Sequence, residues 1–81
     1  MLILNDVQKR RKLKGITQKE LSNELSISLA TIIKVEKLNY CPKYQIRKKL
    51  CDYFGVRMGQ LFYREDNGNG MQQRKIIESN I

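Results

Sequence analysis

The stretch from Thr17 to Glu36, TQKELSNELSISLATIIKVE, decides the fold of this chain. Its first four residues, Thr17-Gln18-Lys19-Glu20, have the S/T-x-x-E form of a capping box, in which a hydroxyl and a carboxylate satisfy unpaired N–H groups at a helix start. Ser26-Ile27-Ser28 then interrupts the helix, and Ser28 can cap a second one. The stretch therefore predicts two short amphipathic helices joined by a tight turn.

The second of these helices has an inward stripe and an outward face. At helical spacing Ile32 and Val35 point inward, and the other faces carry Leu29, Ala30, Thr31, Ile33 and Lys34. Rotating the helix would place this second set in the core instead, but burying both sets would require a helix that is apolar all round. The pattern is typical of a helix-turn-helix, in which one helix braces and the next presents its first turn to base edges in the DNA major groove.

The flanking sequence predicts three more helices, and no stretch alternates as a strand would. Good helix formers run from Val7 to Lys14, with Asn5 or Asp6 as the N-cap and Gly15 as the stop. Asn39 is a plausible left-handed stop for the helix before it, and Pro42 is expected to open the fourth helix. A short fifth helix is expected at about Met58 to Phe62. The prediction is an all-α, compact domain of five helices over residues 1–63.

After Tyr63 the composition changes. Residues 64–81 begin with a stretch rich in Asn and Gly and are predicted to be a flexible connector followed by a short C-terminal segment. Within that segment Met71 to Ile81 can form a short helix, although its isoleucines make a poor stripe for an isolated one.

The net charge of +8 favours a polyanion as the partner. Thirteen of the 16 Lys and Arg residues and five of the 8 acidic residues precede Arg64, so the predicted domain carries the whole excess. A cationic helix on a membrane surface is the competing interpretation. It would need a long apolar face, and the basic run from Lys9 to Lys14 contains only Leu13, so no membrane partner is expected.

Several other classes of protein are disfavoured by what the sequence lacks. Cys41 and Cys51 are ten residues apart and there is no histidine, whereas a zinc site needs roughly four nitrogen or sulfur ligands, so no metal or other cofactor is expected. No phosphate-binding glycine loop or recognisable carboxylate pair suggests an enzyme. The apolar N-terminal residues are too few for a signal peptide, and a cytoplasmic protein with reduced thiols is the simplest expectation.

The ordered set of motifs closely resembles the phage-repressor and Cro-like family of helix-turn-helix domains, often called the XRE family. The resemblance covers about residues 3–63 and implies a repressor-like fold. Three residues depart from the family pattern: Ser26 and Leu38 stand where glycine is usual, and Cys51 replaces a buried alanine, so we interpret Cys51 as a small core residue. The matching residues are Arg11, Gly15-Ile16-Thr17-Gln18, Glu20-Leu21-Ser22, Ile27-Ser28, Ile32, Glu36, Pro42, Leu50-Cys51, Phe54-Gly55-Val56 and Leu61-Phe62.

The resemblance also implies particular site residues. Gln18 is expected to bond a phosphate or an adenine, against the plainer interpretation of an exposed residue at a helix start. Arg11 is expected to pair with Glu36 as a structural ion pair and to face a phosphate. The predicted base contacts are Gln18, Ser28, Leu29, Ala30, Thr31, Ile33 and Lys34. The predicted phosphate contacts are Arg11, Thr17, Lys19, Lys37, Asn39, Tyr40, Lys43 and Tyr44.

Two properties of the residues themselves support these contacts. The exposed apolar side chains at the start of the second helix suit thymine methyl groups, and Lys34, one turn on, can reach either a guanine edge or a phosphate. The basic residues from Arg47 to Lys49 are instead interpreted as a solvated face.

These observations predict a sequence-specific transcriptional regulator, a repressor that binds a two-fold symmetric operator in double-stranded DNA as a homodimer. The fifth helix, with Leu61, Phe62 and Tyr63, is expected to be the main dimer contact, and residues 71–81 an accessory one. Two alternatives stay open: an antitoxin-type autorepressor, and a protein-interaction module whose partner binds residues 71–81.

Overall fold

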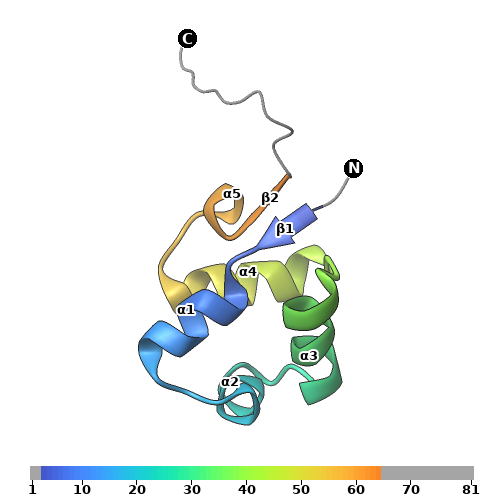
Figure 1. Cartoon of the computed structure of the whole chain (residues 1–81). Coiled ribbons are helices and arrows are strands. Elements are labelled where there is room, and N and C mark those ends of the chain that lie inside the picture. Colours follow the sequence, from blue (N-terminus) through green and yellow to red (C-terminus); the bar gives the residue numbers. More distant parts are fainter. Residues whose placement is uncertain (1–2, 65–81) are drawn as a thin grey trace, which may run out of the picture.

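The computed structural model describes residues 3–64, which form five helices and two short strands (Figure 1). The predicted five-helix, helix-turn-helix architecture is confirmed. The predicted connector beyond Arg64 and the predicted helix over Met71 to Ile81 lie outside the described residues, so the domain boundary stays a prediction. In chain order the elements are β1 (Ile3–Asn5), α1 (Val7–Lys14), α2 (Gln18–Leu25), α3 (Leu29–Leu38), α4 (Tyr44–Phe54), α5 (Met58–Leu61) and β2 (Phe62–Arg64).

The two strands are the part of the fold that the sequence did not predict. β1 and β2 pair antiparallel, with Leu4 opposite Tyr63 and Asn5 opposite Phe62. The two ends of the described chain therefore lie side by side at one end of the helical domain (Figure 1). Phe62, expected as the last residue of the fifth helix, instead begins β2. Three residues in each strand are too few to show an alternating pattern.

Four helices end at a residue in the left-handed conformation, which reverses the chain over the last turn. Gly15 and Gly55 take this role after α1 and α4, with φ of 73° and 68°. Ser26 and Asn39 take it after α2 and α3, with φ of 54° and 52°. The predicted stops at Gly15 and Asn39 are confirmed. Ser26 carries the larger strain, because serine adopts this region less readily than asparagine or glycine.

The start of α4 differs from the prediction. Pro42 is buried two residues before the helix, and the N-cap is Lys43, whose carbonyl accepts hydrogen bonds from the N–H groups of Ile46 and Arg47 at 3.0 Å each. The Pro42 carbonyl instead accepts a 3.0 Å bond from Nε of Arg47. The prediction that Pro42 opens the helix is wrong, because the helical hydrogen bonds begin at the Lys43 carbonyl and the Arg47 side chain occupies the Pro42 carbonyl.

The core lies between the helices and extends to the two strands, where Phe62 is buried and Ile3 packs against the core. The predicted inward residues of α3, Ile32 and Val35, are fully buried, and the interpretation of Cys51 as a core residue is confirmed. Burial, with a smaller contribution from the neighbouring Asp52 carboxylate, raises the pKa of the Cys51 thiol. The buried apolar residues are Val7, Leu21, Ile27, Ile32, Val35, Leu50, Cys51, Leu61 and Phe62.

This core overturns one expectation about the dimer contact. Leu61 is 0% exposed and Phe62 is 6% exposed, so both side chains already pack inside one subunit. The Tyr63 hydroxyl donates a 2.6 Å hydrogen bond to Oδ1 of Asp6. Leu61 and Phe62 therefore offer almost no surface to a second copy, and the expectation that they form the main dimer contact is wrong.

The N-terminal strand is also hydrogen-bonded to α3. Nδ2 of Asn5 donates to the Val35 carbonyl at 2.9 Å, and Oδ1 of Asn5 accepts from the Val7 N–H at 3.0 Å. Asp6 occupies the N-cap position of α1 without a side-chain capping bond, so the two residues proposed for this cap have different roles. Asn5 thus connects β1, the start of α1 and the end of α3.

Candidate nucleic-acid interface

The turn between α2 and α3 is held by bonds on both sides of its buried residue, Ile27. The Ile27 N–H donates to the Ser22 carbonyl at 3.1 Å, and the Ser22 hydroxyl donates to the Ile27 carbonyl. Ser22 is itself buried, which allows the two backbones to approach closely. Because Ile27 fills the core at the same time, the angle between α2 and α3 is fixed by packing and hydrogen bonds together.

Both helices of this pair begin with side-chain caps. The Thr17 hydroxyl accepts from the Glu20 N–H at 3.0 Å, and the Glu20 carboxylate accepts from the Thr17 N–H at 2.7 Å, which confirms the predicted capping box. The Ser28 hydroxyl accepts from the Thr31 N–H at 3.1 Å and donates to Oγ1 of Thr31 at 2.8 Å. These bonds fix where each helix begins, and therefore which side chains stand on its first turn.

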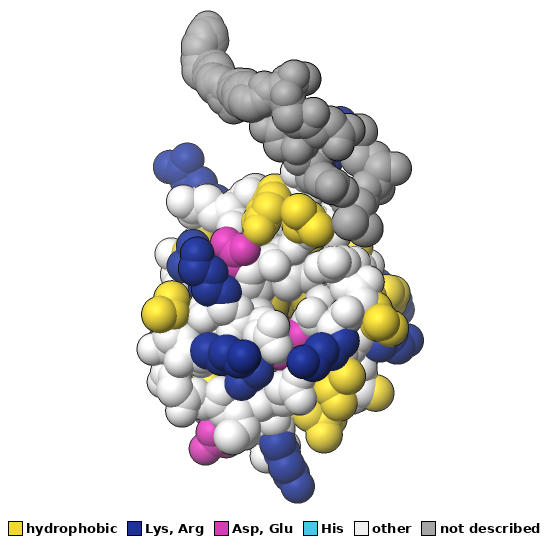
Figure 2. All heavy atoms as spheres, in the orientation of Figure 1, with side chains coloured by type: hydrophobic (Ala, Val, Ile, Leu, Met, Phe, Trp, Pro, Cys, Tyr) yellow, Lys and Arg dark blue, Asp and Glu magenta, His cyan; other side chains and the backbone are white. Residues whose placement is uncertain are grey.

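The outward face of α3 is apolar at its start and cationic further along. Leu29 and Ile33 are each 39% exposed, although large apolar side chains are normally buried. Ala30, Lys34 and Lys37 are exposed beside them, and Thr31 is half-buried. Figure 2 shows hydrophobic side chains together with Lys and Arg side chains on the part of the surface over α3, at the lower right. The predicted base-contact residues of α3 thus share one accessible surface.

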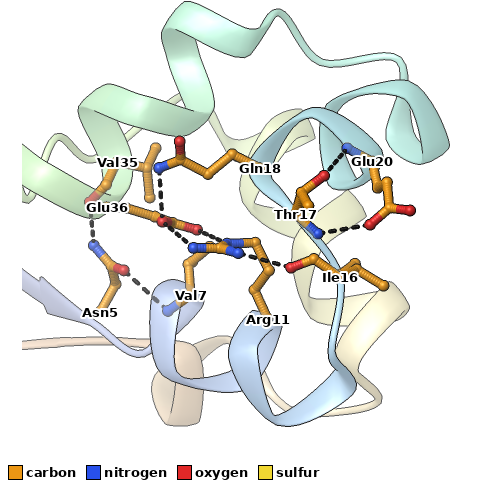
Figure 3. Close-up of polar contacts among 9 residues, drawn as sticks. All are labelled: Asn5, Val7, Arg11, Ile16, Thr17, Gln18, Glu20, Val35 and Glu36. Carbon is orange, nitrogen blue, oxygen red and sulfur yellow. Dashed lines mark hydrogen bonds and ion pairs between the residues drawn. The ribbon is translucent and has the colours of Figure 1, made fainter.

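A buried carboxylate joins the helices α1, α2 and α3. Glu36 in α3 accepts from Nε of Arg11 at 2.7 Å and from Nη2 at 3.1 Å, which is a bidentate ion pair (Figure 3). The Glu36 side chain is 0% exposed and that of Arg11 is 10% exposed. Nη1 of Arg11 also donates to the Ile16 carbonyl at 2.7 Å, just before α2. The pair therefore fixes α1, the segment leading into α2, and the end of α3.

Gln18 is the third partner of the same carboxylate. Its Nε2 donates to Oε1 of Glu36 at 3.0 Å, and the side chain is half-buried between α2 and α3 (Figure 3). Sequence reasoning placed Gln18 either at the DNA or free at a helix start, and it missed this bond. The two residues are 18 positions apart on different helices, so no local pattern links them. The bond holds the amide beside the N-terminus of α2.

The predicted phosphate contacts fall on two edges around α3. At the first edge, Thr17 and Lys19 are exposed at the N-terminus of α2, where unpaired N–H groups and the helix dipole favour an anion. At the second edge, Tyr40 is 43% exposed, Tyr44 is 57% exposed, and Lys43 is exposed between them. Lys37 is also exposed, whereas Asn39 is half-buried as the left-handed stop of α3.

Arg47 belongs to the second edge and not to the freely solvated face expected of it. Its Nε bond to the Pro42 carbonyl holds the side chain back over the loop, and its guanidinium carbon is 5.8 Å from the centroid of the Tyr44 ring. Its neighbours differ: Lys48 pairs with Asp52 at 3.2 Å in an exposed i, i+4 pair, and Nζ of Lys49 donates to the Leu25 carbonyl at 3.1 Å. The spacing of Arg47 from Pro42 was the available signal, but it cannot predict the rotamer.

Other kinds of site find no support in residues 3–64. Within this range no group of His, Cys, Asp and Glu side chains is placed to hold a metal ion, and there is no pocket for a small molecule. The two thiols are separate, with Cys41 exposed and Cys51 buried. Across the same residues, no helix has the length and apolar character needed to span a membrane.

The fold defines a helix-turn-helix domain, in which α2 and α3 are the two helices of the motif. The model of the helix-turn-helix family matches residues 7–61, and the chain belongs to this family. It is 35% identical over 63 residues to the uncharacterized HTH-type transcriptional regulator MJ0272 of Methanocaldococcus jannaschii, covering 78% of this chain and 96% of that one. It is 27% identical over 62 residues to the uncharacterized HTH-type transcriptional regulator YgzD of Bacillus subtilis, covering 76% and 94%. The chain is thus a member of a family of DNA-binding transcriptional regulators.

Proposed function

We propose that this protein is a sequence-specific repressor that binds a two-fold symmetric operator in double-stranded DNA as a homodimer, without catalytic activity. The observation that carries the proposal is the exposed first half of α3, where Leu29 and Ile33 are each 39% exposed on a helix that the fully buried Glu36 carboxylate holds in place. Neighbouring apolar side chains exposed on a rigidly held helix face fit contact with a second molecule. A repressor needs only to occupy its operator, so a small domain suffices.

Base selection is assigned to the first turns of α3 and to the start of α2. Methyl groups of Leu29, Ala30 and Ile33 are suited to thymine methyls in the major groove. The hydroxyls of Ser28 and Thr31 can bond to either a donor or an acceptor on a base edge. Gln18 of α2 and Lys34 of α3 complete the proposed base-contact set.

Phosphate binding is assigned to the two edges around that face. On the α2 edge the proposed contacts are Arg11, Thr17 and Lys19. The other edge follows α3 into α4. The proposed contacts there are Lys37, Asn39, Tyr40, Lys43 and Tyr44. Their ammonium, amide and phenol groups can each donate a hydrogen bond to a phosphate oxygen. Contacts on both sides of the groove would fix the orientation of α3 while the first turn selects the bases.

Dimerisation is proposed because one recognition helix contacts too few base pairs for useful specificity, and two subunits can bind half-sites about one turn apart. Residues 71–81 are proposed as an accessory contact between subunits or with a protein partner. Deleting residues 65–81 and measuring mass in solution and operator affinity tests this role. A truncated protein that dimerises and binds as the full chain does would show that the segment has no such role.

Selection of bound sequences from a random duplex pool, followed by a salt titration on the selected duplex, tests the proposal as a whole. A dimer that neutralises about eight phosphates should give a log–log slope of affinity against salt near −7. A scrambled duplex of the same composition serves as the control and should bind much more weakly. No enrichment in the selection, or an affinity that does not change with salt, would refute the proposed function.

A further inference from the structure

The side chain of Lys34 is held by an aromatic ring and does not extend freely from α3. Its Nζ lies 5.0 Å from the centroid of the Tyr40 ring. Tyr40 reaches this position because Asn39, with φ of 52°, reverses the chain at the end of α3. The Tyr40 N–H then donates to the Lys34 carbonyl at 3.3 Å. Tyr40 therefore contacts both the backbone and the ammonium group of Lys34.

This ring contact sets the direction in which the ammonium points. An exposed cation–π contact favours the stacked arrangement by roughly two- to fivefold over a free rotamer. Tyr40 follows the end of α3 and leads into the segment before α4, so the stacked ammonium lies toward that segment. The apolar residues Leu29, Ala30 and Ile33 precede Lys34 along α3, whereas Tyr40 follows the helix, so the ring holds the ammonium toward the C-terminal end of α3.

The surroundings of the stacked ammonium suit a phosphodiester. Lys37, Lys43 and Arg47 lie in the same stretch of chain, and Arg47 is held against Tyr44 in a second contact between a cation and a ring. From residue 34 to residue 47 the sole acidic residue is Glu36, whose side chain is fully buried and paired with Arg11. No exposed carboxylate in this stretch would repel a phosphate.

We propose that Lys34 binds a backbone phosphate and not a base edge, and that Tyr40 is the positioning residue that directs it there. This inference rests on the proposed DNA-binding function and moves Lys34 from the proposed base contacts to the phosphate contacts. Discrimination between bases then depends on Gln18 and on the uncharged residues of α3, and Lys34 contributes affinity that is independent of sequence. The ring of Tyr40 acts through Lys34, in addition to any contact made by its own hydroxyl.

The first test separates a phosphate contact from a base contact. Affinities of the full-length wild-type protein and of Lys34→Met are measured on the selected duplex and on a panel of its single base-pair variants, at several salt concentrations. Lys34→Met should weaken binding to every duplex by the same factor, and the salt slope should become less steep by about 0.9 for each subunit. Lys48→Met removes the same charge from an exposed pair on α4 and should leave the slope unchanged.

A base contact would give a different result. If Lys34→Met relaxes the preference at one position of each half-site and leaves the salt slope unchanged, the inference is overturned while the proposed function stands. If the wild-type protein shows no salt-dependent binding to any duplex, the inference about Lys34 and the proposed function fail together. Melting curves of each variant check that it is folded, which is expected because Lys34 and Lys48 are both exposed.

The second test isolates the ring. Tyr40→Phe keeps the ring and removes the hydroxyl, whereas Tyr40→Leu removes both. Binding by Tyr40→Leu should be weaker than binding by Tyr40→Phe by about two- to fivefold, and this difference should vanish when both are measured in the Lys34→Met background. A difference that persists without the lysine would overturn the positioning role of Tyr40, because the ring would then act independently of Lys34.

Discussion

Removing the buried carboxylate with Glu36→Ala should destabilise the domain far more than removing an exposed one. The substitution leaves the Arg11 guanidinium, 10% exposed, without its 2.7 Å and 3.1 Å bonds to Glu36, and only the 2.7 Å bond to the Ile16 carbonyl remains. Breaking one partner of a buried pair costs roughly 3–5 kcal/mol. Because Arg11 keeps one bond and slight exposure, we expect the lower end, about 3 kcal/mol.

That loss is large for a domain of this size. At about 0.05–0.15 kcal/mol per residue, the described domain has a stability of roughly 3–9 kcal/mol. A loss of about 3 kcal/mol corresponds to a fall in melting temperature of more than about 10 °C. Glu36→Gln keeps a neutral acceptor for Arg11 and should cost less, about 1–2 kcal/mol, because hydrogen bonds to charged groups are stronger than neutral ones. This milder variant stays measurable if the alanine variant does not fold.

The chain offers a matched control on α4. The pair of Lys48 and Asp52 has side chains that are 55% and 67% exposed, so Asp52→Ala should cost no more than about 0.5 kcal/mol. Urea unfolding of wild type, Glu36→Ala, Glu36→Gln and Asp52→Ala, followed by circular dichroism, gives the comparison. If Glu36→Ala costs as little as Asp52→Ala, the buried pair does not contribute to stability as argued.

Three further predictions concern other parts of the chain. Ser26→Gly should raise the free energy of unfolding by about 0.5 kcal/mol in the same assay. Relief of the left-handed strain in the folded state should exceed the cost of the greater backbone entropy of glycine in the unfolded state, and a lower free energy of unfolding would contradict this. The bond to the Asp6 carboxylate, more than burial, raises the pKa of Tyr63 to about 12. The contribution of this bond to the free energy of unfolding should therefore be complete below about pH 10 and lost as the pH rises through 12. The stability difference between wild type and Tyr63→Phe should shrink over that window, and a difference that is constant with pH would show that the tyrosine pKa is unshifted. Replacing thymine with uracil at one or two operator positions should cost about 1 kcal/mol of binding, and tolerance at every position would mean that the apolar face of α3 does not contact methyl groups.

The features that could be predicted from the sequence depend on residues a few positions apart. The capping box joins Thr17 and Glu20, and the stops at Gly15 and Asn39 follow from the backbone freedom of one residue. The inward stripe of α3 follows from helical spacing alone. Such local signals suffice for the order of the five helices and for the choice of outward face.

The rest depends on contacts between distant residues or on rotamers. Arg11 and Glu36 are 25 positions apart, and only the resemblance to a known family suggested that they meet. The bond from Gln18 to the same carboxylate, the pairing of β1 with β2, and the burial of Phe62 all arise from packing that no local pattern encodes. The stacking of Lys34 on Tyr40 depends further on which rotamer a flexible side chain adopts.

An apolar recognition surface places a particular demand on the structure beneath it. Contacts between methyl groups have no directional bond to correct a misplaced helix, and dispersion weakens within an ångström of the best separation. The first turn of α3 must therefore be held in place before DNA arrives. The bonds of Glu36 to Arg11 and Gln18 hold α3 against α1 and α2, and the bonds between Ser22 and Ile27 fix the turn. Under the proposed function, the same buried carboxylate that stabilises the domain also sets the position from which α3 meets the bases, so substitutions at Glu36 should change stability and specificity together.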